Sequence, residues 1–162
     1  MTLPHKGQPR KHHMNTERLY QLYKKSTGVC TDTRKIEKGN LFFALKGPAF
    51  NANNFAANAL ALGASTVVLD DPQRFQKSDQ AYFLVEDGLK ALQTLALYHR
   101  RKLNIPILAI TGTNGKTTTK ELIHVVLGTK FKTVATVGNL NNHIGVPLTL
   151  LRMDSSTEIG IV

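Results

Sequence analysis

The sequence predicts an α/β protein made of two successive units, and three observations support this. Short apolar runs, often β-branched, alternate with helical patterns along the whole chain. One of these runs, residues 107–110, leads directly into a glycine-rich loop and another helical pattern. The composition, with 41% hydrophobic and 20% charged residues, is that of an ordinary soluble globular protein. We therefore expect a small α/β unit over residues 15–103 and the start of a P-loop-type parallel-sheet unit over residues 107–162.

The first unit is predicted as strands alternating with helices. Asn15 or Thr16 can cap a first helix, which Gly28 ends. Strands are expected at residues 29–33, 41–45, 66–69 and 82–85. Two further helices are expected, one at residues 55–62 closed by Gly63 and one at residues 88–103 capped by Asp87.

The second unit begins after Asn104-Ile105-Pro106, a short helix-breaking segment that we take as the domain boundary. Its expected elements are strands at residues 107–110, 132–136 and 158–162, a helix at 117–127 and a loop at 137–146. Three strands with one or two helices cannot cover both faces of a parallel sheet. We therefore expect this unit to be truncated.

The N-terminal residues and the cysteine content limit the cellular context. Residues 1–14 are polar and basic without an apolar core, so we expect a disordered tail, not a secretory signal. No apolar run approaches the roughly 20 residues of a membrane span. A single cysteine, Cys30, cannot form an internal disulfide, which is typical of a reducing cytoplasm. We expect a cytoplasmic monomer without membrane insertion.

The net charge of +10 does not indicate a nucleic-acid partner, because the basic residues are scattered. There is no basic stripe interleaved with aromatic residues and no recognisable nucleic-acid motif. The cluster at residues 100–102 lies at a predicted helix end, where cations suit the helix dipole. An anionic small molecule is the better-fitting partner.

The glycine-rich loop has the features of a phosphate-binding P-loop. Gly112 and Gly115 allow backbone N–H groups to converge on phosphate oxygens, and the following helix adds its positive N-terminal end. The Lys116 ammonium would lie along the phosphates, and the Thr117 hydroxyl would bind Mg²⁺. The common motif has glycine where this chain has Ile110, so an ordinary glycine-rich turn is the alternative.

A second polar loop, residues 138–147, follows the next strand and therefore lies on the same edge of the sheet. It contains three asparagines between glycines, and their amides suit hydrogen bonding to a polar ligand. A turn without any ligand explains the same residues equally well.

Four segments resemble the Mur ligase family. Residues 111–118, Thr-Gly-Thr-Asn-Gly-Lys-Thr-Thr, resemble its P-loop, which characteristically lacks the first glycine. Residues 138–151 are similar to the branch of the family that adds D-alanyl-D-alanine. Residues 31–34 and 41–47 are similar to the UDP-binding domain of that family, and the whole resemblance covers about residues 15–162.

The resemblance implies an ATP-dependent peptide ligase of peptidoglycan precursor synthesis. ATP would phosphorylate the terminal carboxylate of UDP-N-acetylmuramoyl-tripeptide, and the amine of D-alanyl-D-alanine would attack the acyl phosphate. It further implies that residues 15–103 bind the UDP substrate and that residues 107–162 begin the ATP-binding domain. Mg²⁺ is the implied metal.

The resemblance also assigns residues. Lys116 would be catalytic by stabilising the transferring phosphoryl group, and Thr117 would help to hold Mg²⁺. The ATP phosphates would be held by Gly112, Thr113, Asn114, Gly115, Lys116, Thr117 and Thr118. The substrate would be bound by Thr33, Arg34, Leu45, Phe55, Asn141 and Asn142. The chain departs from the family at residues 51–54, where Asp-Gly-His is common, and at His143, where acidic residues are common.

Other functions remain open at this point. The chain could be another Mur-type ligase, a stand-alone or degenerate nucleotide-binding module, or an unrelated P-loop kinase. The acids after the P-loop are Glu121, Asp154 and Glu158, and none follows an apolar strand, where a Mg²⁺-binding carboxylate belongs. We therefore expect the 162-residue chain alone to be inactive as a ligase. His124 is expected to be packed or exposed without a ligand role.

Overall fold

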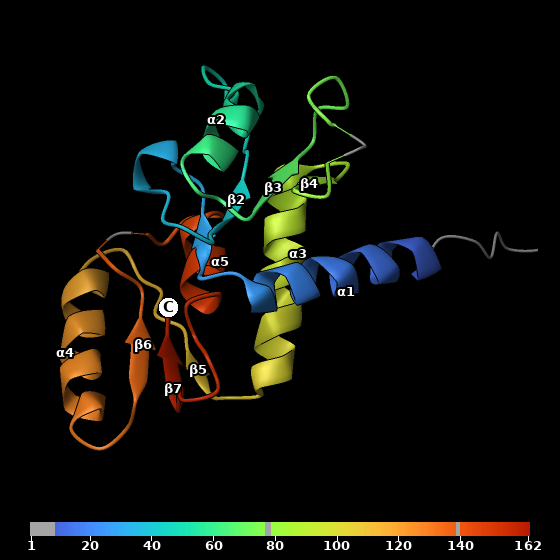
Figure 1. Cartoon of the computed structure of the whole chain (residues 1–162). Helices are drawn as coiled ribbons and strands as arrows, with labels where there is room; N and C mark the ends of the chain where they lie inside the picture. Colours follow the sequence, from blue (N-terminus) through green and yellow to red (C-terminus); the bar gives the residue numbers. More distant parts are fainter. Residues whose placement is uncertain (1–8, 77–78, 139) are drawn as a thin grey trace, which may run out of the picture.

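Two parallel sheets, one in each predicted unit, organise the fold. The computed structural model describes residues 9–76, 79–138 and 140–162. The first sheet has the order β1-β2-β3-β4, with β1 at Val29–Cys30, β2 at Leu41–Phe43, β3 at Thr66–Leu69 and β4 at Tyr82–Leu84. The second sheet has the order β5-β7-β6, with β5 at Ile107–Leu108, β6 at Thr133–Ala135 and β7 at Ile159–Ile161. All neighbouring strands in both sheets are parallel. This α/β architecture, with its parallel sheets, confirms the predicted fold class (Figure 1).

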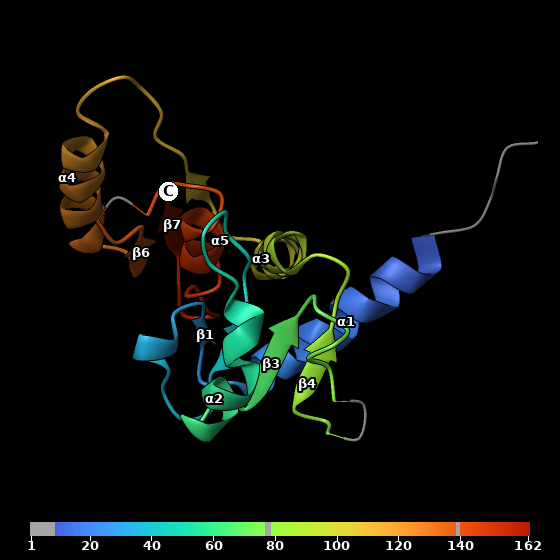
Figure 2. The same cartoon turned by 90° about the horizontal axis from the view of Figure 1, so that it is seen from above.

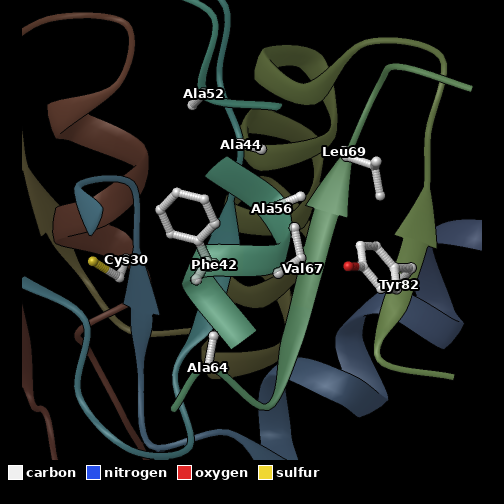
Figure 3. Close-up of a cluster of buried hydrophobic side chains, with 10 residues drawn as sticks. Cys30, Phe42, Ala44, Ala52, Ala56, Ala64, Val67, Leu69 and Tyr82 are labelled. Atoms are coloured by element: carbon white, nitrogen blue, oxygen red, sulfur yellow. The ribbon is translucent and has the colours of Figure 1, made fainter. Parts of the chain in front are cut away.

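Side chains alternate between the two faces of the first sheet along each strand, and both faces are buried. Phe42 of β2 and Val67 of β3 point to one face, where α2 (Ala56–Ala61) covers them (Figure 3). Phe43 of β2 points to the opposite face, where α3 (Gly88–Leu103) packs. A parallel sheet needs cover on both faces, and this one has it.

The helices of the first unit begin near their predicted caps, with one exception. Asp87 accepts a hydrogen bond from the Lys90 amide and caps α3 at the predicted residue. The first helix, α1 (Pro9–Lys25), begins earlier than the predicted Asn15 or Thr16, so residues 9–14 are helical. A proline suits the first helical position because its missing N–H needs no partner there. Residues 1–8 of the expected tail lie outside the described part of the chain. No helix among the described residues is long and apolar enough to cross a membrane.

Two short 3₁₀ turns replace parts of predicted elements. The turn Thr33–Lys35 takes the end of the strand expected at residues 29–33, because the Asp32 carboxylate accepts from the Arg34 amide and curls the backbone. The turn Ala52–Phe55 precedes α2. It forms for the same reason, because the Asn51 side chain accepts a hydrogen bond from the Asn53 amide.

The second sheet places β7 between β5 and β6. Helix α4 (Lys116–Gly128) follows the glycine loop and lies beside β6 (Figure 1). A Cβ added to Gly160 in β7 would lie 2.5 Å from the Ile107 side chain and 2.6 Å from that of Met153. Both atoms are side-chain ends, so a larger residue in the central strand would have to displace them.

Helix α5 (Gly145–Leu150) lies mostly beyond the loop predicted at residues 137–146 and was not expected. It packs on α3, and the two lie side by side on one face of the first sheet (Figure 2). Ile144, Leu148 and Leu151 join the same core cluster as Leu41 of β2. Residues of the second predicted unit thus complete the core of the first.

A buried histidine fastens this junction. His99 of α3 is only 2% exposed, and its Nε2 lies 2.7 Å from the Met153 carbonyl oxygen. Because a carbonyl oxygen only accepts, Nε2 carries the proton. The Tyr23 hydroxyl of α1 donates to the Leu151 carbonyl at 2.8 Å and lies 3.2 Å from the same Nε2. Three segments far apart in the sequence therefore meet in one polar cluster.

Acid should weaken this junction through His99. Burial is the main reason that the pKa of His99 lies below its ordinary value of 6.5, and Lys24 lowers it further, while the Met153 carbonyl and Asp154 act in the opposite sense. Below a pH of 6.5 the His99 side chain binds a proton in the unfolded chain but stays neutral longer in the folded chain. The free energy of unfolding therefore falls as the pH falls. Denaturant titrations at about pH 7.5 and about pH 5.5 should show a lower unfolding midpoint in acid.

The matched variants are His99→Gln, which keeps a donor for Met153, and His143→Gln, which changes an exposed histidine. His99→Gln should reduce the acid sensitivity, whereas His143→Gln should leave it as in the unchanged chain. An equal pH dependence in all three proteins would contradict the role of His99.

Candidate phosphate and nucleotide sites

The glycine loop has the backbone of a phosphate cradle. Gly115 has φ 75°, a left-handed conformation that favours glycine, and it stands directly before α4. Gly112 has φ 152°, and residues 111–115 are exposed. The first N–H groups of α4 have no partner within the helix, so they are free to bind an anion. The strand–loop–helix order predicted for this segment is confirmed.

Lys116 folds back over this loop. Its Nζ donates to the Gly112 carbonyl and lies 3.4 Å from the Thr113 carbonyl oxygen. Thr117 and Thr118 follow it on the exposed first turn of α4. The ammonium, the hydroxyls and the helix N-terminus therefore gather at one place, where they suit a phosphate chain.

The loop after β6, which we call the asparagine loop (residues 138–144), lies at the same sheet edge as the glycine loop, because both follow parallel strands. Asn142 Oδ1 accepts hydrogen bonds from the amides of Ile144 at 3.0 Å and Gly145 at 2.8 Å. The side-chain oxygen of Asn142 thus accepts the first amide of α5, and its side-chain nitrogen is left to bind a ligand. Asn141 is exposed, and Asn139 lies outside the described residues.

Gly145 ends this loop at a point of very close approach. A Cβ added there would lie 2.3 Å from the Leu140 carbonyl oxygen, closer than any real contact. Gln93 of α3 donates to the His143 carbonyl at 3.1 Å and holds the loop against the first unit. The asparagine loop, which follows β6 of the second sheet, is therefore also held to α3 of the first unit.

A cleft of about 510 Å³ opens in the first unit. Its lining comes from the turn after β1 and from the segment between β2 and α2. The lining residues are Thr31, Asp32, Thr33, Arg34, Phe42, Phe50, Ala52 and Phe55. Three of the predicted substrate residues, Thr33, Arg34 and Phe55, are thus brought to one cleft.

Arg34 is paired at the cleft with a carboxylate. Its Nε and Nη2 lie 2.9 Å and 2.7 Å from the two oxygens of Asp32. The hydrogen bonds from the Arg34 side chain and amide lower the pKa of Asp32 to about 2. The guanidinium is 85% exposed, so one edge of it is accessible to a ligand.

Two exposed aromatic rings stand at the same cleft. Phe50 and Phe55 stack with their centroids 5.4 Å apart and their planes 15° from parallel, although the side chains are 56% and 38% exposed. Sequence reasoning named Phe55 but missed Phe50, because only the folded turn at residues 51–55 brings the rings together.

The loop that carries these rings is braced by a buried asparagine. Asn53 is fully buried, its Nδ2 donates to Asp70 at 2.9 Å, and its Oδ1 accepts from the Asp70 amide at 3.1 Å. Lys46 forms an ion pair with Asp70 at 2.9 Å. The residues that differ from the family pattern at 51–54 therefore stabilise the loop that contains them.

Leu45 lies apart from the cleft. Its side chain packs with the core on the α3 face of the first sheet, the face opposite to Phe42. Only its backbone approaches the cleft, since its carbonyl oxygen accepts from the Ala52 amide at 3.0 Å. The substrate role assigned to Leu45 stays a prediction.

Comparison with family models identifies both parts of the chain. Residues 25–100 match the model described as Mur ligase family, catalytic domain, and residues 110–162 match the Mur ligase middle domain. Among curated relatives, the UDP-N-acetylmuramoyl-tripeptide–D-alanyl-D-alanine ligase of Bacillus subtilis is 45% identical over 135 residues, which are 83% of this chain and 30% of the relative. The ligase of the same name from Escherichia coli is 40% identical over 83% of this chain and 29% of its own length.

Solved structures give the same result. A crystal structure of MurF from Acinetobacter baumannii has a TM-score of 0.77 and 32% identity, covering 91% of this chain and 34% of that protein. The MurF ligase from Thermotoga maritima in complex with ADP has a TM-score of 0.72 and 28% identity, covering 86% of this chain and 32% of that protein. The chain spans about a third of the length of the proteins that it matches.

Gly145 offers a test of the asparagine-loop geometry. Gly145→Ala should destabilise the chain by about 1–3 kcal/mol, because the added methyl group overlaps the Leu140 backbone. The control is Gly128→Ala in α4, whose added Cβ would meet only the Thr133 hydroxyl at 3.7 Å. Denaturant titration should find Gly128→Ala within about 1 kcal/mol of the unchanged chain. Equal stability of the two variants would contradict the close approach.

Proposed function

Because the chain belongs to the Mur ligase family, we propose that it supplies the UDP-substrate and ATP-binding parts of a ligase that joins D-alanyl-D-alanine to UDP-N-acetylmuramoyl-tripeptide. The observation that carries this proposal is the presence on one chain of a phosphate cradle at residues 111–118 and an aromatic cleft at residues 31–55. The reaction would proceed through an acyl phosphate of the tripeptide carboxylate. Its product would be a precursor of peptidoglycan.

The phosphate cradle would act by positioning and charge. The amides at the start of α4 would bind phosphate oxygens, and the Lys116 ammonium would leave the Gly112 carbonyl to stabilise the phosphoryl group in transfer. Both groups sit on a rigid helix end, which keeps them in place while charge moves.

Thr117 is the residue that we propose for Mg²⁺. Its hydroxyl is a hard oxygen ligand on the exposed first turn of α4, beside the loop that would hold the phosphates. Mg²⁺ in such sites keeps several waters and binds substrate phosphates and a carboxylate as well, so the Thr117 hydroxyl would be one ligand among these. When bound, the ion would neutralise charge on the phosphates.

The cleft of the first unit would hold the UDP part of the substrate. The Phe50–Phe55 stack offers a flat apolar surface on which a uracil ring can lie. The exposed edge of Arg34 would bind the diphosphate while Asp32 holds the guanidinium in orientation. Thr33 lies at the same turn and offers a hydroxyl.

The asparagine loop would face the peptide side of the substrate. The loop follows β6 at the same sheet edge as the cradle, and Gln93 of the first unit holds it at His143. We therefore expect Asn141 and the amide nitrogen of Asn142 to lie near the tripeptide carboxylate. We further propose that the protein is a cytoplasmic monomer, in keeping with its buried, unpaired Cys30.

Lys116 gives the direct test of the cradle. In the 162-residue chain, Lys116→Ala should weaken Mg·ATP binding at least roughly tenfold, because a charged donor to phosphate is lost. In a complete ligase the same change should lower turnover by orders of magnitude. Titration calorimetry measures the first effect, and Lys130→Ala, which changes an exposed lysine in the turn after α4, is the matched control. Unchanged ATP affinity in Lys116→Ala would remove the phosphate role.

Phe55 gives the corresponding test of the cleft. Phe55→Ala should weaken UDP binding roughly tenfold, since stacking on an aromatic ring contributes about 1–3 kcal/mol per base. ATP binding should not change, because the cradle lies in the other unit. Phe131→Ala, in the connection between α4 and β6, is the control and should affect neither ligand. If UDP binds Phe55→Ala as tightly as it binds the unchanged chain, the base does not lie on this ring.

A further inference from the structure

Lys120 is a buried lysine that neither proposed site uses. It stands one helical turn after Lys116 on α4, and it is only 5% exposed. Its ammonium turns away from the glycine loop toward the end of β6. There it donates to the carbonyl oxygen of Thr136 and, at 3.0 Å, to that of Gly138.

The ammonium is fully supplied with acceptors at this place. Glu121 adds an ion pair at 2.9 Å, so three acceptors match the three N–H donors of a lysine. A buried charge costs several kcal/mol unless it is paired and hydrogen-bonded in this way. Glu121 is itself 54% exposed and Gly138 is exposed as well, so the Thr136 carbonyl is the buried partner. The contacts therefore hold the backbone carbonyls of Thr136 and Gly138, just where β6 ends.

This backbone is the start of the asparagine loop. The last register pair of β6 and β7 is Ala135 with Ile161, and the sheet ladder gives residues 137 and 138 no partner. Arg152, just after α5, donates to the Ala135 carbonyl from the other side. Two cations from different elements thus fix the place where β6 ends and the loop begins.

The far end of the loop is fixed to the first unit. Asn142 accepts a hydrogen bond from the amide of Gly145, the first residue of α5. Gln93 binds the His143 carbonyl, and α5 packs on α3. Lys120 is therefore the contact that ties the phosphate-binding helix to a loop otherwise held by the UDP-binding unit.

We propose that Lys120 is a positioning residue that sets the asparagine loop relative to the phosphate cradle. The proposal rests on the function proposed above. Lys116 and Lys120 share one rigid helix, so a phosphate held by the first and a loop held by the second keep a constant separation. The peptide end of the substrate would then be presented to the phosphate at a set distance, without any contact between Lys120 and either ligand.

Hydrogen–deuterium exchange of the 162-residue chain tests the contact without any ligand. Lys120→Met keeps the length and apolar stem but removes the ammonium, and Lys130→Met, which changes an exposed lysine just after the same helix, is the control. In Lys120→Met, amide exchange at residues 136–145 should rise at least roughly tenfold while that of β2 and β3 stays unchanged. Lys120→Arg, which restores a cationic donor, should recover part of the protection.

A second measurement separates positioning from simple stability. Saturating Mg·ATP should slow exchange at residues 136–145 in the unchanged chain and in Lys130→Met, but not in Lys120→Met, although ATP affinity changes less than roughly threefold. If ATP does not bind the unchanged chain at all, the proposed function fails. The ligand-free comparison still decides whether the Lys120 contacts hold the loop.

Two results would overturn the role of Lys120. One is unchanged exchange at residues 136–145 in Lys120→Met, and the other is a uniform rise over both sheets, which would mean general destabilisation. If Lys120→Met does not fold, nitrogen-15 NMR of the unchanged chain decides. The Lys120 ammonium protons should exchange more slowly than those of Lys130, and equal rates would contradict the carbonyl contacts.

Discussion

The packing of α5 against α3 is the contact on which the rest of the arrangement depends. Leu148 and Leu151 fill the core of the first sheet, while the chain on both sides of α5 belongs to the second sheet. The carbonyls of Leu151 and Met153 are held by Tyr23 and His99, so apolar burial and directed hydrogen bonds act at the same place. Such a junction resists sliding, because a buried polar group that loses its partner costs about 1–3 kcal/mol. The two sheets are consequently held together by more than the short connection at residues 104–106.

Both candidate ligand regions follow from parallel-sheet geometry. The turn with Asp32 and Arg34 comes directly after β1, and the loop with Phe50 comes after β2. In the second sheet the glycine loop follows β5 and the asparagine loop follows β6. Loops at the carboxyl ends of parallel strands gather on one edge, which is where ligands bind in open α/β sheets. The junction through α5 then determines how the edge of one sheet faces the edge of the other.

Local sequence was sufficient wherever one short segment determined its own structure. The β-branched run at residues 66–69 became β3, and Asp87 caps α3 because its side chain reaches the Lys90 amide. The helix α5 was missed because it has only six residues and contains Pro147, so its stability comes from contacts with a distant part of the chain. The Phe50–Phe55 stack and the Lys120 contacts depend on tertiary structure in the same way. Arg34 was predicted as a ligand residue, but its pairing with Asp32 is what orients it.

We propose that one chain holds separate sites for a nucleoside triphosphate and for a UDP group. The most direct measurement is the chemical-shift change of backbone amides in the nitrogen-15-labelled chain, recorded separately with Mg·ATP and with UDP. We expect ATP to shift residues 111–118 and the asparagine loop, and UDP to shift residues 31–34 and 50–55, with little overlap. Shifts of one common set by both ligands, or no shift at residues 111–118 with saturating ATP, would contradict the account.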